Sequence, residues 1–168
     1  DNIYTSYPAV LKGSMGDEVG ICVVHIDDEP DFSRLTARHL ERNHEQISVQ
    51  TATTGPEGLS LVTAGTDCVI SDYDIGGMTG LEVFKQVRTQ HPELPFILFT
   101  DTGNEEVASR AITAGVTDYL IKGIVAEQHE LLAQKIITSV ERRRAQPKAD
   151  RTHRQLTELA EQTDGVLW

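Results

Sequence analysis

Five side chains that could bind a metal ion and handle a phosphoryl group stand at the ends of apolar runs in this 168-residue chain. Asp27 and Asp28 end the first run, Asp72 ends a later one, and Thr100 and Lys122 close two more. If these runs are parallel strands of one sheet, their carboxyl ends meet at one edge. An acidic residue alone is often a strand end or a helix cap, and a lone lysine is usually just solvated. Because every candidate strand delivers a polar residue to the same edge, the pattern indicates a site.

Three aspartates that lie together at one edge need a cation to offset their negative charge. Carboxylates that lie close together raise each other's proton affinity unless a positive charge intervenes. Mg²⁺ prefers oxygen ligands and keeps several waters, so Asp27, Asp28 and Asp72 could hold it and leave room for a phosphoryl oxygen. Thr100 could donate its hydroxyl to that group, and Lys122 could place its charge against it. A simple capping role for Asp28 stays open, since it precedes a helix.

The elements that would position these residues alternate along the chain. Strand-like apolar runs are followed by segments with helical periodicity. The expected strands are 21–26, 47–52, 68–70, 96–99 and 116–121, and the expected helices are 30–42, 55–62, 81–90, 104–115 and 127–144. Pro30 suits a first helical turn, Asn104 can cap a helix, and Gly115 can end one.

Apolar stripes predict which helix faces are buried. Besides clear stripes in the third and last helices, Phe32, Leu35 and Leu40 share a face of the first helix, and Val107 and Ile112 belong to a stripe of the fourth. The other inward-facing residues expected are His39, Leu59, Val62, Val83, Phe84, Val87, Ala108, Ala111, Leu132, Ile136 and Val140.

Five strands alternating with five helices predict an α/β fold: a doubly wound, flavodoxin-like parallel sheet of order 2-1-3-4-5. Three strands are solid apolar runs, as strands covered on both faces must be. Ile47, Val49 and Thr51 alternate with more polar residues, so the second strand belongs at an edge. Any ligand should lie at the carboxyl ends of the first and third strands.

Residues 20–144 resemble the receiver domain of two-component response regulators. The resemblance rests on the pair Asp27-Asp28, on Asp72 in the run 72–80 (DYDIGGMTG), on Thr100, and on Lys122 in the run 118–123 (DYLIKG). These motifs fall on four strand ends in the family's order.

The resemblance implies that Asp72 is the nucleophile that accepts a phosphoryl group from a partner histidine kinase. It implies that Asp28 and Asp72 bind Mg²⁺ directly, that Asp27 does so through water, and that the backbone carbonyl of Asp74 completes the protein ligands. Thr100 would engage the phosphate.

The resemblance also implies a switch. Tyr119 would swing inward when the Thr100 hydroxyl engages phosphate, which would remodel a protein-interaction face at the fourth helix and fifth strand. Such a domain is not an enzyme with turnover: it catalyses only its own phosphorylation and slow dephosphorylation. A homodimer is a further expected assembly.

Four positions depart from the family's pattern. Gly76 stands where proline is usual, Thr79 where aspartate is frequent, and Gly123 where a proline commonly follows the lysine. The last change puts the rigidity of the Lys122 loop in doubt. Asp101 replaces a small residue beside Thr100, so it and Asp74 should alter the attack of water on the acyl phosphate, in a direction the sequence leaves open.

A haloacid-dehalogenase-like phosphatase or phosphotransferase is the alternative from another class. Such enzymes also place a second aspartate two residues after the nucleophile, as Asp74 follows Asp72. Their metal-binding acids follow the lysine, however, whereas Asp27 and Asp28 precede Lys122, and no cap insertion is visible.

A third alternative is a receiver that has lost phosphorylation and only binds partners. The complete set of acids, threonine and lysine argues against it. Nucleotide or flavin binding would need a glycine-rich loop after the first strand.

The composition limits which binding partners and which cellular compartment we expect. A formal charge of -11, with acidic residues in excess of lysine and arginine, disfavours direct nucleic-acid binding and is typical of proteins from salt-loving organisms. No apolar run is long enough to cross a membrane, so we expect a cytoplasmic protein. Cys22 and Cys68 stand among apolar residues, which favours buried free thiols over a disulfide or a metal site.

The two ends differ from the central domain. Residues 1–19 are expected to form a loose, flexible leader, and residues 145–168 a polar linker interrupted by Pro147. The run 142–144 is more often a solvated helix end than a binding patch. The apolar segment 166–168 is similar to the entry of a PAS domain in haloarchaeal hybrid histidine kinases that begin with a receiver, so the chain is interpreted as the start of such a protein, with a stand-alone regulator as the alternative.

Overall fold

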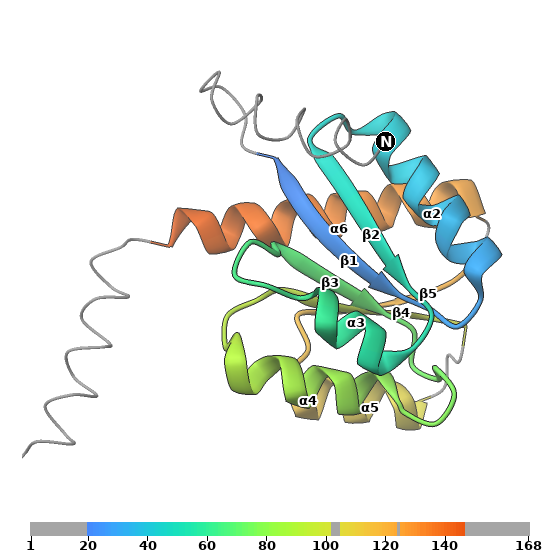
Figure 1. Cartoon of the computed structure of the whole chain (residues 1–168), viewed down its shortest axis with the longest axis vertical. Helices are drawn as coiled ribbons and strands as arrows, with labels where there is room; N and C mark the ends of the chain where they lie inside the picture. Colours follow the sequence, from blue (N-terminus) through green and yellow to red (C-terminus); the bar gives the residue numbers. More distant parts are fainter. Residues whose placement is uncertain (1–19, 102–104, 124, 147–168) are drawn as a thin grey trace, which may run out of the picture.

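The computed structural model describes residues 20–101, 105–123 and 125–146. They form a five-stranded parallel sheet with strands in the order β2-β1-β3-β4-β5 (Figure 1). The strands are β1 (Ile21–Ile26), β2 (Ile47–Ala52), β3 (Cys68–Ser71), β4 (Phe96–Thr100) and β5 (Asp118–Ile121). The predicted fold class and strand order are confirmed.

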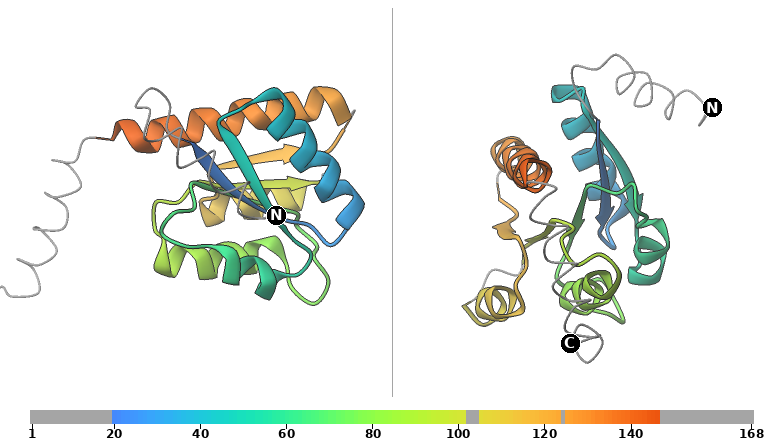
Figure 2. Two further views of the ribbon diagram at one scale, coloured as in Figure 1. Left: turned by 45° about the horizontal axis from the view of Figure 1, so that its top comes forward. Right: turned by 90° about the vertical axis from the view of Figure 1, so that its left-hand side faces the viewer.

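Helices cover both faces of the sheet (Figure 2). They are α2 (Pro30–Asn43), α3 (Gly55–Leu61), α4 (Gly80–Gln90), α5 (Glu105–Ala114) and α6 (Val125–Ala145). On one face, Leu40 of α2 and Leu132 of α6 pack in a core cluster with sheet residues such as Ile70. On the other, Val83 of α4 and Val107 of α5 join a second cluster, against which α3 packs. The sheet is therefore buried on both sides, as its apolar strands require.

The strand pattern matches the position of each strand in the sheet. Every residue of β3 and β4 is buried, whereas in β2, which lies at one edge, only the end residues Ile47 and Ala52 are buried. The predicted edge position of residues 47–52 is confirmed. Pro30 begins α2, and Gly115 ends α5 with a φ of 91°, as expected. Among the described residues no helix has both the length and the apolarity needed to cross a membrane.

Three predicted burials are wrong. Cys22 is exposed, because it lies at the amino end of β1 beside the charged Asp67 and Arg144, whereas Cys68 is buried as expected. Leu35 and Ile112 are 43% and 74% exposed. The buried faces of these helices are narrower than predicted: they consist of Ser33, Thr36 and Leu40 in α2, and of Val107 and Ala111 in α5.

Element ends differ slightly from the prediction: β5 begins at Asp118 rather than at residue 116, and α6 at Val125 rather than at residue 127. The domain's expected limit at residue 144 falls one residue before α6 ends at Ala145. The predictions for the leader 1–19, for Asn104 and for most of the segment 145–168 concern residues outside the described ones.

Candidate functional site

Three carboxylates gather at the carboxyl ends of β1 and β3. Asp27 and Asp28 follow β1, Asp72 follows β3, and each offers an oxygen within 4.8 Å of the others. Asp27 and Asp72 are buried, while Asp28 is exposed. The structure thus brings together the acids that the sequence analysis selected, at the predicted edge of the sheet.

The backbone holds Asp27 and Asp72 in place by continuing the sheet beyond the strand ends. The Asp27 N–H donates to the carbonyl of Ala52 at 2.9 Å, and the Asp72 N–H donates to that of Ile26 at 2.9 Å. Behind Asp72, a Cβ on Gly80 would lie 2.3 Å from the Asp72 carbonyl oxygen. Glycine is therefore required where α4 begins against the loop that carries the acid.

Lys122 bridges two of the acids. Its Nζ donates to Oδ2 of Asp27 at 2.7 Å and to Oδ2 of Asp72 at 3.1 Å, and its side chain is only 10% exposed. Burial alone would lower the pKa of this ammonium, but the hydrogen bond to Asp27 and the charge of Asp72 outweigh burial and raise the pKa. Lys122 is therefore a fixed positive charge beside the Asp72 carboxylate.

Thr100 lies fully buried at the end of β4, and its carbonyl accepts the Lys122 N–H at 2.8 Å. Tyr119, in β5, is paired in register with Leu98 and packs partly buried against the α4 and α5 side of the core. Asp74 is exposed and forms an isolated backbone bridge with Thr79, outside the carboxylate cluster.

The departures from the family's pattern have local explanations. Gly76 has a φ of 62°, which proline cannot adopt. Thr79 caps α4 in a capping box with Glu82. Just before Lys122, the carbonyl of Ile121 accepts a hydrogen bond from Nε2 of Gln128 at 2.9 Å, so this contact ties the end of β5 to α6. Asp101 is exposed.

The site carries more negative than positive charge. Partial burial and the neighbouring charges of Asp27 and Asp72 raise the pKa of Asp28. Lys122 neutralises only part of this charge. A cluster of hard oxygen donors with an excess negative charge is chemically suited to Mg²⁺.

Two residues near the site were not selected from the sequence. His25, two residues before Asp27, is fully buried, and its Nε2 lies 4.0 Å from Asp27 Oδ2. Burial first, and the positive charge of Lys122 second, lower its pKa to about 3, so the ring is neutral. The ring of Phe32 lies under Lys122 Nζ at 4.2 Å. The helical stripe placed Phe32 inward, but no motif connected it with the lysine.

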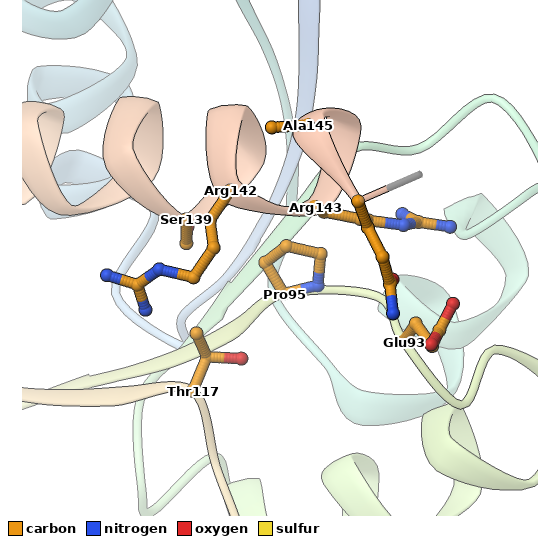
Figure 3. A pocket seen from close by; sticks show the side chains of 8 residues that line it. Glu93, Pro95, Thr117, Ser139, Arg142, Arg143 and Ala145 are labelled. Atoms are coloured by element: carbon orange, nitrogen blue, oxygen red, sulfur yellow. The ribbon is translucent and has the colours of Figure 1, made fainter. Parts of the chain in front are cut away.

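A pocket of about 510 Å³ lies at the opposite end of the sheet (Figure 3). Pro95 and Thr117 precede β4 and β5, and Arg142 and Arg143 come from the last turns of α6. Because the acids stand at the carboxyl ends of the strands, this pocket takes no part in the site described here. The candidate site lies instead at the carboxyl ends of the strands, where Asp28 is exposed.

The arrangement can support transfer of an anionic group. A buried carboxylate, Asp72, faces an ammonium and lies in a cluster of oxygens that could hold a divalent cation. A cation and an ammonium at that edge would offset the charge of an incoming phosphoryl group.

Comparisons with known proteins agree with this geometry. The family model for the response regulator receiver domain matches residues 23–136. A solved receiver domain from Clostridium thermocellum is 25% identical, with a TM-score of 0.66 over 74% of this chain and 97% of that one. The chemotaxis protein CheY4 of Vibrio cholerae is 26% identical, with a TM-score of 0.64 over 70% of this chain and 99% of that one.

A curated relative is longer than this chain. The response regulator SaeR of Staphylococcus aureus is 26% identical over 132 residues, which cover 79% of this chain but only 57% of SaeR. The chain thus matches little more than half the length of SaeR. Since the family model matches more than half of the sequence, including all five residues of the strand-end pattern, the chain belongs to the response regulator receiver family.

Proposed function

We propose that this chain is a phosphoacceptor that takes a phosphoryl group from a histidine kinase onto Asp72. The observation that carries the proposal is the contact of a buried lysine with two of three clustered aspartates: Lys122 lies 3.1 Å from the carboxylate that would react. A positive charge in this place stabilises a phosphoryl group that arrives beside it.

In the proposed reaction, an oxygen of Asp72 attacks the phosphorus of a phosphohistidine. The new O–P bond forms as the P–N bond breaks, and the imidazole leaves with the bonding electrons and takes up a proton. Oδ1 of Asp72 accepts the N–H of Tyr73 at 2.7 Å, while Oδ2 faces Lys122. Lys122 would exchange its contact with Asp72 for a phosphoryl oxygen, and the Thr100 hydroxyl would bind another.

The donor set fits Mg²⁺. Asp28 and Asp72 would hold the ion, with the backbone carbonyl of Asp74, and Asp27 would act through water because Lys122 already occupies its Oδ2. When bound, the ion supplies positive charge against the transferring phosphoryl group. This role requires the carboxylates to be ionised.

The proposed output is a change of protein partner. Thr100 and Tyr119 lie on neighbouring strands, β4 and β5. When the Thr100 hydroxyl binds phosphate, the half-buried ring of Tyr119 would therefore move as well. The face formed by α5 and β5 would then bind a second copy of the chain or a domain that follows in the same protein, in the cytoplasm and without direct contact to nucleic acid. The phosphatase alternative gains no support, since Asp74 is exposed and lies outside the carboxylate cluster.

The test is labelling of the full chain by a small acyl phosphate with and without Mg²⁺. We expect stoichiometric labelling that requires Mg²⁺ and is lost in Asp72→Asn. Asp31→Asn is the control, because Asp31 is an exposed aspartate of the neighbouring helix α2 that pairs only with Arg34 among the contacts described. Labelling that survives in Asp72→Asn, or continuous turnover of a phosphate monoester, would refute the proposal.

A further inference from the structure

The ammonium of Lys122 has a third contact besides its two carboxylates. Its Nζ lies 4.2 Å from the centroid of the Phe32 ring, which comes from the first turn of α2. A cation over an aromatic face at this distance is attracted by the electrons of the ring. The three hydrogens of the ammonium can thus be directed to Asp27, to Asp72 and to the ring.

The Phe32 ring is itself held by three other rings. His25 of β1 packs edge-on at 6.4 Å, and Phe99 of β4 and His129 of α6 lie tilted at 5.8 Å and 5.7 Å between ring centroids. All three neighbours are buried. The side chain of Phe32 is therefore fixed by two strands and a second helix, although its own helix stands at the surface.

The histidines of this cluster are neutral. Nε2 of His129 is 2.8 Å from the hydroxyl of Thr36, which ties α6 to α2. Burial, and then the charge of His39, lower the pKa of His129 to about 4, and the pKa of His25 is about 3. Neither ring competes with Lys122 for the Phe32 face as a cation at neutral pH.

Phosphorylation would change the contact of Lys122 with Asp72 but not its contact with the Phe32 ring. When Asp72 forms an O–P bond, its oxygen becomes part of a phosphoryl group, and the ammonium must move from one oxygen to another. Asp27, at 2.7 Å, would compete for it. The Phe32 ring carries no charge, so it can hold the ammonium near the acids without trapping it on either.

We propose that Phe32 is a positioning residue for Lys122, and that its fixed ring keeps the ammonium beside Asp72 while the oxygen partners exchange. The inference rests on the proposed phosphoacceptor function for its effect on rate, but the contact itself can be tested without phosphorylation. None of the contacts described for Phe32 joins it to a proposed metal ligand, so its effect passes through the lysine.

The first test is nuclear magnetic resonance of the full chain. Protons above an aromatic face are shielded, so the ε-methylene protons of Lys122 should resonate upfield. Phe32→Leu should remove this shift and Phe32→Tyr should keep it. Phe84→Leu is the matched control, because Phe84 lies under Arg88 at 4.8 Å on the other face of the sheet and loses a cation contact of the same kind.

The second test is the rate of Mg²⁺-dependent labelling of Asp72 by a small acyl phosphate. We expect Phe32→Leu to slow labelling about threefold to tenfold, the size of a partly buried cation–π contact. Phe32→Tyr should restore the rate, and Phe84→Leu should leave it within about twofold once each variant is shown by thermal unfolding to be folded. Loss of packing alone would slow both leucine variants to a similar degree.

The outcomes separate the two proposals. An unchanged Lys122 resonance in Phe32→Leu refutes the positioning role, whatever the labelling. An upfield shift that depends on Phe32, in a parent chain that is never labelled, refutes the phosphoacceptor function and leaves the contact established. Equal labelling rates of the parent and Phe32→Leu, with the shift lost, refute the role in catalysis.

Discussion

The two ends of the sheet carry charge in opposite arrangements. At the amino end, Arg144 pairs with Asp67 at 3.2 Å and donates to the carbonyl of Gly20 at 2.7 Å. Asp67 also accepts the Cys22 N–H at 2.8 Å, so the pair ties the last turn of α6 to the start of β1. At the carboxyl end, three aspartates lie together, and Lys122 bridges two of them.

The difference separates structural charge from functional charge. The pair at the amino end is balanced and partly exposed, so it contributes little free energy and needs no ligand. The cluster at the carboxyl end gathers like charges, which cost stability unless a cation is present. A fold gains nothing from that imbalance, whereas binding of a cation and a phosphoryl group depends on it. Substitutions at the two ends should therefore respond differently to Mg²⁺.

The largest effect is expected from Lys122→Met. Asp27 has no exposure, so loss of its ammonium partner leaves a buried carboxylate uncompensated, and we expect a loss of about 3 kcal/mol in the free energy of unfolding without metal. Labelling of Asp72 should fall about a hundredfold, because a charge aimed at the phosphoryl group is gone. Urea unfolding with and without Mg²⁺, and labelling by a small acyl phosphate, measure both.

Lys135→Met is the control for that variant. Lys135 pairs with Asp118 at 2.9 Å, but both side chains are partly exposed, so the expected loss is at most about 1 kcal/mol and labelling should not change. The proposal would be contradicted if both lysine variants lost the same free energy of unfolding. It would also be contradicted if Mg²⁺ did not reduce the loss in Lys122→Met, because the cluster would then behave like an ion pair at the surface.

A smaller effect is expected from Asp28→Asn. Removing one charge from the proposed ligand set should weaken Mg²⁺ binding about a hundredfold, measured by titration calorimetry. Without metal the variant should unfold at a higher urea concentration than the parent at neutral pH, because the repulsion from Asp27 and Asp72 is relieved.

The pH dependence of the unfolding free energy should reveal this repulsion. The pKa of Asp28 is higher in the folded chain than in the unfolded chain, so the folded state binds the proton more tightly. Stability contributed by Asp28 is therefore present at pH below its unfolded pKa and is lost as pH rises through the folded pKa. Metal-free unfolding curves between pH 3 and 7 should show this loss in the parent and a flatter profile in Asp28→Asn. Identical pH profiles of the parent and Asp28→Asn would show that Asp28 does not contribute to the repulsion.

The strand ends could be predicted from the sequence because apolar runs are long and parallel sheets align their carboxyl ends. Asp72, Thr100 and Lys122 lie where that reasoning placed them. The burial of particular side chains was harder to predict, because an apolar stripe defines the buried face of a helix only to within about one residue. Leu35 was therefore read as inward, although the line that faces the core carries the small residues Ser33 and Thr36.

The Phe32 contact could not be predicted from the pattern. Phe32 and Lys122 are 90 positions apart, and their distance depends on where α2 begins relative to the end of β5. An inward aromatic in the first turn of a helix is common in any core. The same limit applies to Cys22, whose neighbours in the sequence are apolar but whose neighbour in space is the charged Asp67.

The smallest effect is expected from Arg144→Gln at the balanced end. The side chains of Arg144 and Asp67 are 35% and 24% exposed, so loss of the pair should cost at most about 1 kcal/mol in unfolding free energy, with no dependence on Mg²⁺. Amide hydrogen exchange should rise in the last turn of α6 and at Cys22, whose N–H is donated to Asp67. Labelling of Asp72 should be unchanged, because the pair lies at the far end of the sheet. A labelling defect in Arg144→Gln would mean that the two ends are coupled, and the division between structural and functional charge would then fail.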